Sequence, residues 1–140
     1  MSKRILITGG AGFIGSHLLS HFAEQAEVTV LDDLRSGYAR NLEGVRCRFL
    51  QGSILDDVTL KQAIAGAEEV YHLAAMISVP ESMLHPRDCV ELNATGTLHV
   101  LEAAAAAKVG KVVLASSAAI YGDNPTVPKV ETMTPEPKSP

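Results

Sequence analysis

The chain has 140 residues, of which 46% are hydrophobic and 20% are charged, and its formal net charge is −4. This length suits one ordinary domain, and its core must be mainly aliphatic because Trp is absent and only 4% of residues are aromatic. We find no basic stripe, membrane-length apolar run or signal-peptide pattern, so we expect neither nucleic acid nor a membrane as a partner. Cys47 and Cys89 match no metal or redox spacing, and we expect reduced thiols in a cytoplasmic protein.

A glycine-rich turn lies between the first predicted strand, residues 4–8, and a predicted helix, residues 12–25. Two spacings overlap in it, Gly10-x-Gly12-x-x-Gly15 and Gly9-x-x-Gly12-x-x-Gly15. One glycine makes the tight turn, one lets the backbone approach a pyrophosphate, and one lets the helix pack on the strand. The pattern therefore predicts an anion site on the N–H groups at the start of the helix.

An acidic residue ends the second predicted strand, residues 27–32. This residue is Asp32, placed 17 residues after Gly15. A carboxylate there can accept hydrogen bonds from the ribose hydroxyls of an adenine nucleotide. A glycine turn alone could bind nothing, but strand, turn, helix, strand and acid in this order favour a dinucleotide site.

Strands and helices continue to alternate along the rest of the chain. After a polar loop, 33–38, we predict a strand over 46–50, a helix capped by Asp56 or Asp57 and closed by Gly66, and a strand over 69–73. A long helix over 86–108 and a strand over 111–116 follow. The alternation predicts an α/β fold with a doubly wound parallel sheet in the order 3-2-1-4-5, and a ligand site beyond the carboxyl ends of its strands.

Five motifs follow one another along the chain: Thr8–Gly15, Leu31–Gly37, His72–Ala75, Asn93–Thr97 and Ser116–Gly122. In this order they resemble the extended short-chain dehydrogenase/reductases, in their NAD-dependent epimerase/dehydratase branch and closest to UDP-hexose 4-epimerases. The resemblance covers essentially the whole chain. It implies a truncated Rossmann domain over residues 1–122 and a proline-rich extended loop over 123–140.

The resemblance also implies which residues bind the cofactor, NAD. The glycine turn would hold the pyrophosphate and Asp32 the adenosine ribose, where its charge would repel the extra phosphate of NADP. Ser53 stands where the family usually has Asp, so adenine contacts there should be weaker. Asn93 would tie down the neighbouring loop. The full set is Gly9, Gly12, Phe13, Ile14, Gly15, Asp32, Asp33, Leu34, Ser36, Gly37, Ser53, Ile54, Leu73, Ala74, Ala75, Asn93 and Ser116; no metal site is expected.

Ser117 matches the catalytic Ser/Thr of this family, whose hydroxyl would hydrogen-bond the sugar hydroxyl that is oxidised. Ala118 and Ala119 stand where sugar dehydratases carry acids, and methyl groups cannot transfer protons. This favours epimerisation at C4 of a UDP-hexose over dehydration. Whether the sugar is a hexose or an N-acetylhexosamine stays open.

The Tyr-x-x-x-Lys pair on which this chemistry depends is absent: Tyr38, Tyr71 and Tyr121 are followed four positions on by Leu, Ala and Pro. We therefore expect a fragment of a longer enzyme that binds NAD but is catalytically incomplete. Apolar surface left uncovered should favour a homo-oligomer or self-association. The alternatives are a non-catalytic NAD-sensing module, another NAD-dependent sugar-nucleotide dehydratase or reductase, and a structural fragment without a working site.

Overall fold

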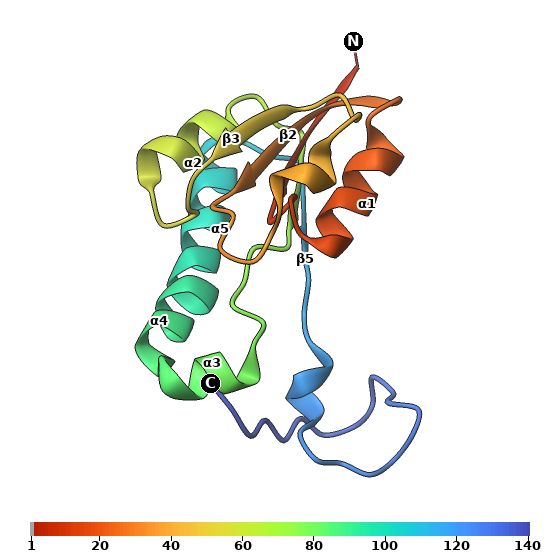
Figure 1. The fold of residues 1–140 in the computed structure, drawn as a ribbon, viewed down its shortest axis with the longest axis vertical. Helices are drawn as coiled ribbons and strands as arrows, with labels where there is room; N and C mark the ends of the chain where they lie inside the picture. Colours follow the sequence, from red (N-terminus) through yellow and green to blue (C-terminus); the bar gives the residue numbers. More distant parts are fainter. Residues whose placement is uncertain (1) are drawn as a thin grey trace.

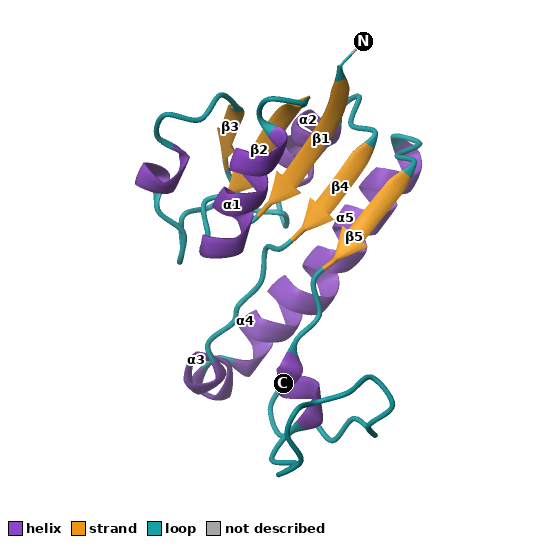
Figure 2. Ribbon diagram, turned by 90° about the vertical axis from the view of Figure 1, so that its right-hand side faces the viewer, coloured by secondary structure: helices purple, strands orange, loops and turns teal. Residues whose placement is uncertain are grey.

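Five parallel strands form the sheet at the centre of the computed structural model, which describes residues 2–140 (Figure 2). Their order is β3-β2-β1-β4-β5, which confirms the predicted topology. The order places the carboxyl ends of β1 and β4 side by side. This is the switch point of the sheet, because the strands up to β3 are added on one side of β1, and β4 and β5 are added on the other. The strands are β1 (Lys3–Thr8), β2 (Ala26–Asp32), β3 (Arg48–Gln51), β4 (Glu69–His72) and β5 (Lys111–Leu114).

The central strand is buried because helices cover both faces of the sheet. Ile5 and Ile7 belong to the core on one face, with Leu19 of the first helix. Leu6 points to the other core, which includes Val100 from the long helix. An uninterrupted apolar run is the expected sequence of a strand covered on both faces.

Figure 1 shows the helices around this sheet. The helix α1 (Phe13–Phe22) packs on one face; α2 (Asp57–Ile64) and α5 (Gly96–Ala106) pack on the other. The remaining helical elements are α3 (Val79–Leu84), α4 (Pro86–Val90), a π-helical segment (Glu91–Thr95) and the 3-10 turns Ala39–Leu42 and Ala118–Tyr121.

Several predicted boundaries were wrong. The first helix begins after Gly12, which is its N-cap, and ends at Phe22. The predicted helix over 86–108 is interrupted by the π-helical segment, in which the Asn93 carbonyl accepts from the Thr97 hydroxyl at 2.7 Å. The prediction also missed α3, although Ser78 accepts from the N–H of Glu81 as a side-chain cap.

Residues 123–140 contain no helix or strand, and they extend away from the sheet (Figure 1). The division at residue 122 stays a prediction, because secondary structure alone does not define a domain. Several apolar side chains of α4, α5 and β5 are open to solvent: Val90, Leu98, Leu101, Val113 and Leu114. In residues 2–140 no helix combines the length and the apolar character needed to cross a membrane.

Candidate functional site

The glycine turn between β1 and α1 lies directly on the end of β4. Gly9 has a φ of +69°, and a Cβ built there would lie 2.7 Å from the Ala74 nitrogen. Its own N–H donates to the carbonyl of Leu31 at 2.8 Å, which fixes the turn against β2. Only glycine satisfies both the backbone angle and the close contact with the segment that follows β4.

The start of α1 is open to an anion. Gly12 is the N-cap and supplies no side-chain hydrogen bond, and the first turn carries no acidic residue. The side chains of Phe13 and Ile14 are exposed, while Gly15 is buried against the turn. The first N–H groups of a helix have no intrahelical acceptor, so this end can bind a phosphate group through its backbone.

The carboxylate of Asp32 is buried, with 7% of the residue exposed, and it organises the loop beside the turn. Its Oδ2 accepts from the N–H of Ala11 at 2.9 Å, and its Oδ1 accepts from the N–H of Leu34 at 2.8 Å. Each carboxylate oxygen has a second lone pair. The group can therefore hold the loop and still accept hydrogen bonds from ligand hydroxyls.

Asn41 is a further part of this site that sequence reasoning missed. Its Nδ2 donates to the carbonyl of Ala11 at 2.7 Å, and the N–H of Tyr38 donates to the same carbonyl at 3.1 Å. Ala11 is thus held through its N–H by Asp32 and through its carbonyl by Asn41 and Tyr38. A Cβ at Gly37 would collide with Ala11. No motif marks Asn41, because its partner lies 30 residues earlier in the chain.

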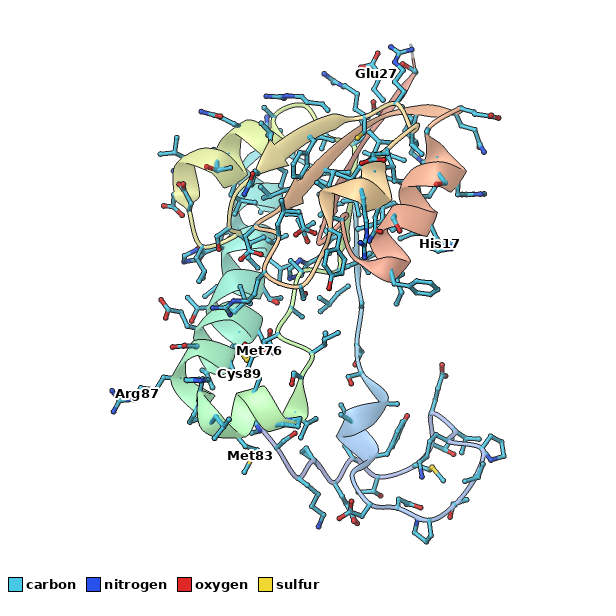
Figure 3. The ribbon with its side chains drawn as sticks, in the orientation of Figure 1. His17, Glu27, Met76, Met83, Arg87 and Cys89 are labelled. Carbon is cyan, nitrogen blue, oxygen red and sulfur yellow. The ribbon has the colours of Figure 1, made fainter. Side chains whose placement is uncertain are left out.

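The residues after β4 are held at both ends. The hydroxyl of Thr8 accepts from the N–H of Ala74 at 3.3 Å. Two residues on, the N–H of Met76 donates to Asn93 Oδ1 at 2.8 Å, and Asn93 Nδ2 donates to the Met76 carbonyl at 3.0 Å. Asn93 therefore does tie down this loop, as expected. Figure 3 shows Met76 close to Cys89, whose sulfur lies 3.4 Å from Asn93 Nδ2.

A buried histidine, His72, lies under this segment. Its ring nitrogens lie within hydrogen-bonding distance of the hydroxyls of Thr8 and Thr97. Burial lowers the pKa of His72 to about 4, so the ring is neutral at pH 7. In the sequence, His72 is one residue of the predicted strand over 69–73, and no pattern there indicates its hydroxyl partners.

The other predicted residues lie where the strands end. Ser53 follows β3 and accepts from the N–H of Leu55 at 3.1 Å. Ile54 points into the core against Gly96, which leaves only its backbone to face a ligand. The exposed loop after β2 carries Asp33 and Ser36, while Leu73 and Ala75 flank Ala74 after β4.

Ser116 and Ser117 follow β5, and both are exposed. The Ser117 hydroxyl accepts from the N–H of Ala119 at 3.1 Å, which leaves its own hydrogen free to donate. Within residues 2–140 no three His, Cys, Asp or Glu side chains cluster in a way that could hold a metal ion.

A doubly wound sheet, a glycine turn at its switch point and an acid at the end of β2 define a dinucleotide-binding protein. The family model "NAD dependent epimerase/dehydratase family" matches residues 5–140. The chain belongs to this family. The match confirms the resemblance found in the sequence, and with it NAD as the expected cofactor.

Curated relatives agree with the family. The chain is 34% identical over 138 residues to a UDP-glucose 4-epimerase of Klebsiella pneumoniae, and covers 99% of it. It is 42% identical over 144 residues to a UDP-glucose 4-epimerase of Mycolicibacterium smegmatis, with 98% of this chain and 46% of that protein covered. A UDP-N-acetyl-alpha-D-glucosaminuronate decarboxylase of Bacillus cytotoxicus is 38% identical over 126 residues. The chain spans less than half the length of most of these relatives.

Solved structures give the same fold. The UDP-glucose 4-epimerase of Thermotoga maritima, crystallised with UDP-glucose, has a TM-score of 0.90 at 39% identity, with 97% of this chain and 45% of that chain covered. The UDP-glucose 4-epimerase of Thermus thermophilus, in complex with NAD, has a TM-score of 0.86 at 40% identity and the same two coverages, 97% and 45%. The individual roles of the site residues stay predictions.

Proposed function

We propose that this chain binds NAD and forms the NAD-binding part of a nucleotide-sugar 4-epimerase. The observation that carries the proposal is the hydrogen bond from the N–H of Ala11 to the buried Asp32. It joins the candidate pyrophosphate turn to the candidate ribose acceptor in one preformed unit. The lone pairs of Asp32 that Ala11 and Leu34 do not use are available to the hydroxyls of a ligand.

The residues present fit the cofactor. The uncapped start of α1 would take the pyrophosphate, and Asp32 the adenosine ribose, with Asp33, Leu34, Ser36 and Gly37 around it. Ser53, Ile54 and Ser116 would border the site, and the segment Leu73–Ala75 would lie under the nicotinamide half. Bound NAD would supply a hydride acceptor and donor for a sugar carbon.

Ser117 would contact the sugar. Its hydroxyl is exposed, and its hydrogen is free because the oxygen acts as acceptor for Ala119. Ala118 and Ala119 beside it offer no acid or base, which supports epimerisation rather than elimination of water. The UDP-sugar substrate is inferred from relatives that are named UDP-glucose 4-epimerases.

The 140 residues alone should not turn over substrate. The general base of this chemistry would be a tyrosine in a Tyr-x-x-x-Lys pair. No such pair accompanies Ser117, since none of the three tyrosines is followed four positions on by Lys. The exposed apolar residues Leu98, Leu101 and Leu114 should favour self-association, which sedimentation velocity at several protein concentrations can measure.

Titration of the 140-residue chain with NADH, followed by nicotinamide fluorescence, tests the binding function. We expect saturable binding of NADH and much weaker binding of NADPH. No binding would contradict the proposal and favour a structural fragment. A search for UDP-hexose interconversion in the protein from its natural source then separates an epimerase from an NAD-sensing module.

The intact mass of that natural protein decides whether further chain is available for the missing base. A mass well above 14.8 kDa would support the epimerase, and a Tyr-x-x-x-Lys pair should then follow Pro140. A mass of 14.8 kDa would favour the sensing module.

A further inference from the structure

A line of buried hydrogen bonds crosses from β1 through β4 to α5. Thr8 and His72 are paired neighbours in the sheet, and both are nearly inaccessible to solvent. The Thr8 hydroxyl lies 2.6 Å from His72 Nδ1, and His72 Nε2 lies 3.0 Å from the Thr97 hydroxyl. Figure 2 shows the three elements adjacent, with α5 behind β4.

The direction of each hydrogen bond follows from counting hydrogens. The Thr97 hydroxyl gives its single hydrogen to the Asn93 carbonyl at 2.7 Å, so it can only accept from His72. Nε2 of the neutral ring therefore carries the proton, and Nδ1 is an acceptor. The Thr8 hydroxyl must then donate to Nδ1.

This orientation leaves the lone pairs of Thr8 for the chain after β4. Its hydroxyl oxygen accepts from the N–H groups of Leu73 and Ala74, both at 3.3 Å. Leu73 has a second acceptor, the Thr8 carbonyl at 3.0 Å, whereas the Thr8 hydroxyl is the acceptor found for Ala74 among residues 2–140. The hydrogen bond of the Ala74 amide therefore depends on the orientation of the Thr8 hydroxyl.

The position of the Ala74 amide affects the site because the glycine turn packs directly against it at Gly9. The position of a Cβ at Gly9 is 2.7 Å from the Ala74 nitrogen and 2.8 Å from the Leu73 carbonyl carbon. A shift of this peptide toward Gly9 would therefore displace the turn as well.

We propose that His72 is a positioning residue of the cofactor site: as the acceptor for the Thr8 hydroxyl, it keeps the Leu73–Ala74 peptide seated against Gly9. Its effect on cofactor binding rests on the function proposed above. A histidine that only fills the core would contribute to stability, without a separate effect on this peptide or on the cofactor.

Two variants separate these roles, because each keeps one half of the ring's hydrogen bonding. In His72→Asn the side-chain oxygen can occupy the place of Nδ1 and accept from Thr8, but it cannot reach Thr97. In His72→Gln the amide can occupy the place of Nε2 and bond Thr97, but Thr8 loses its acceptor. Both variants lose one hydrogen bond and some ring packing, so both should lower stability.

Amide hydrogen exchange of the 140-residue chain without cofactor is the first measurement. We expect exchange at Ala74 to be about threefold to tenfold faster in His72→Gln than in His72→Asn, after correction for global stability. Equal exchange in the two variants would overturn the proposal. If neither variant folds, the ¹⁵N shifts of His72 in the unaltered chain decide, since a proton on Nδ1 would exclude donation from Thr8.

NADH affinity is the second measurement. We expect His72→Gln to bind NADH about threefold to tenfold more weakly than His72→Asn. Equal affinities in both variants would overturn the role in cofactor binding. If the unaltered chain binds no NADH, the proposed function fails, and the exchange at Ala74 still decides whether His72 positions the peptide.

Discussion

The backbone N–H of Ala11 donates to Asp32 Oδ2 over 2.9 Å, and this bond joins the glycine turn to the end of β2. Ala11 is fully buried and lies in the middle of the turn. The second oxygen of Asp32 accepts from Leu34, at the start of the next loop. One carboxylate therefore fixes both the proposed pyrophosphate turn and the loop beside the proposed ribose site.

Replacing Asp32 with Asn should weaken both the fold and cofactor binding. The backbone N–H of either Ala11 or Leu34 would then face an amide NH₂ in place of a carboxylate oxygen. A lost hydrogen bond to a charged acceptor costs about 1.5–3 kcal/mol. We expect NADH affinity to fall about tenfold or more, as measured by fluorescence titration. The control is Glu43→Gln, an equal change of charge on an exposed residue outside the site. Equal NADH affinity in the two variants would contradict the role of Asp32.

Two glycines with similar backbone angles allow the energetic cost of a side chain at the close contact of Gly9 to be measured. Gly9 and Gly44 have φ values of +69° and +75°, but a Cβ at Gly44 would meet nothing within 4 Å. Gly44→Ala should therefore cost only the backbone term, about 1 kcal/mol. Gly9→Ala adds a collision with Ala74 and should cost about 1–3 kcal/mol more. Urea unfolding of both variants gives the difference, and equal midpoints would contradict the contact.

The order of the strands and the place of the glycine turn could be predicted because they depend on short-range patterns. Apolar runs mark β1 and β2, and the glycines and Asp32 stand at their ends. Alternation of strands and helices then leaves few topologies. The boundaries were less accurate because helix ends depend on local hydrogen bonds that the apolar pattern does not show. At the end of α1, for example, the side chain of Gln25 donates to the carbonyl of His21.

The hydrogen bonds that fix the site could not be predicted from the same patterns. Asn41 bonds a backbone carbonyl 30 residues away, and His72 lies between hydroxyls 64 residues before it and 25 residues after it. Polar side chains of this kind are frequent in loops and strands, and only the fold determines which of them meet. The π-helical segment around Asn93 likewise leaves no periodic signal.

Removing the side chain of Asn93 should loosen the segment after β4. In Asn93→Ala the N–H and carbonyl of Met76 both lose their partner, and we expect a loss of about 1–3 kcal/mol in the free energy of unfolding. The matched control is Asn124→Ala, in an exposed turn, which should change stability by about 0.5 kcal/mol or less. Chemical denaturation measures both. Equal losses would contradict the role of Asn93 in holding the loop.

Stability should depend on pH through His72. Burial holds its pKa at about 4, below the ordinary value of 6.5. Between these values the unfolded chain binds a proton that the folded chain does not, so stability falls as the pH falls, by at most about 1.4 kcal/mol per pH unit. Urea midpoints measured from pH 7 to pH 4.5 should show this slope. It should be absent in His72→Asn and in His72→Gln, and a slope that persists in both would assign it to another group.

A second acid effect should arise from Glu69 at a lower pH. The ammonium of Lys3 lies 2.6 Å from Glu69 Oε1, and with the Tyr71 hydroxyl it lowers the pKa of Glu69 below the ordinary 4.5. A carboxyl with a lowered pKa stabilises the fold above its unfolded value, and this contribution is lost as the pH falls below about 4.5. Because Lys3 is half exposed, Glu69→Gln should cost about 1 kcal/mol or less at pH 7. The cost should disappear toward pH 3, in contrast to the His72 effect, which develops above pH 4. A Glu69→Gln cost that stays constant from pH 7 to pH 3 would show that lost packing, rather than charge, causes it.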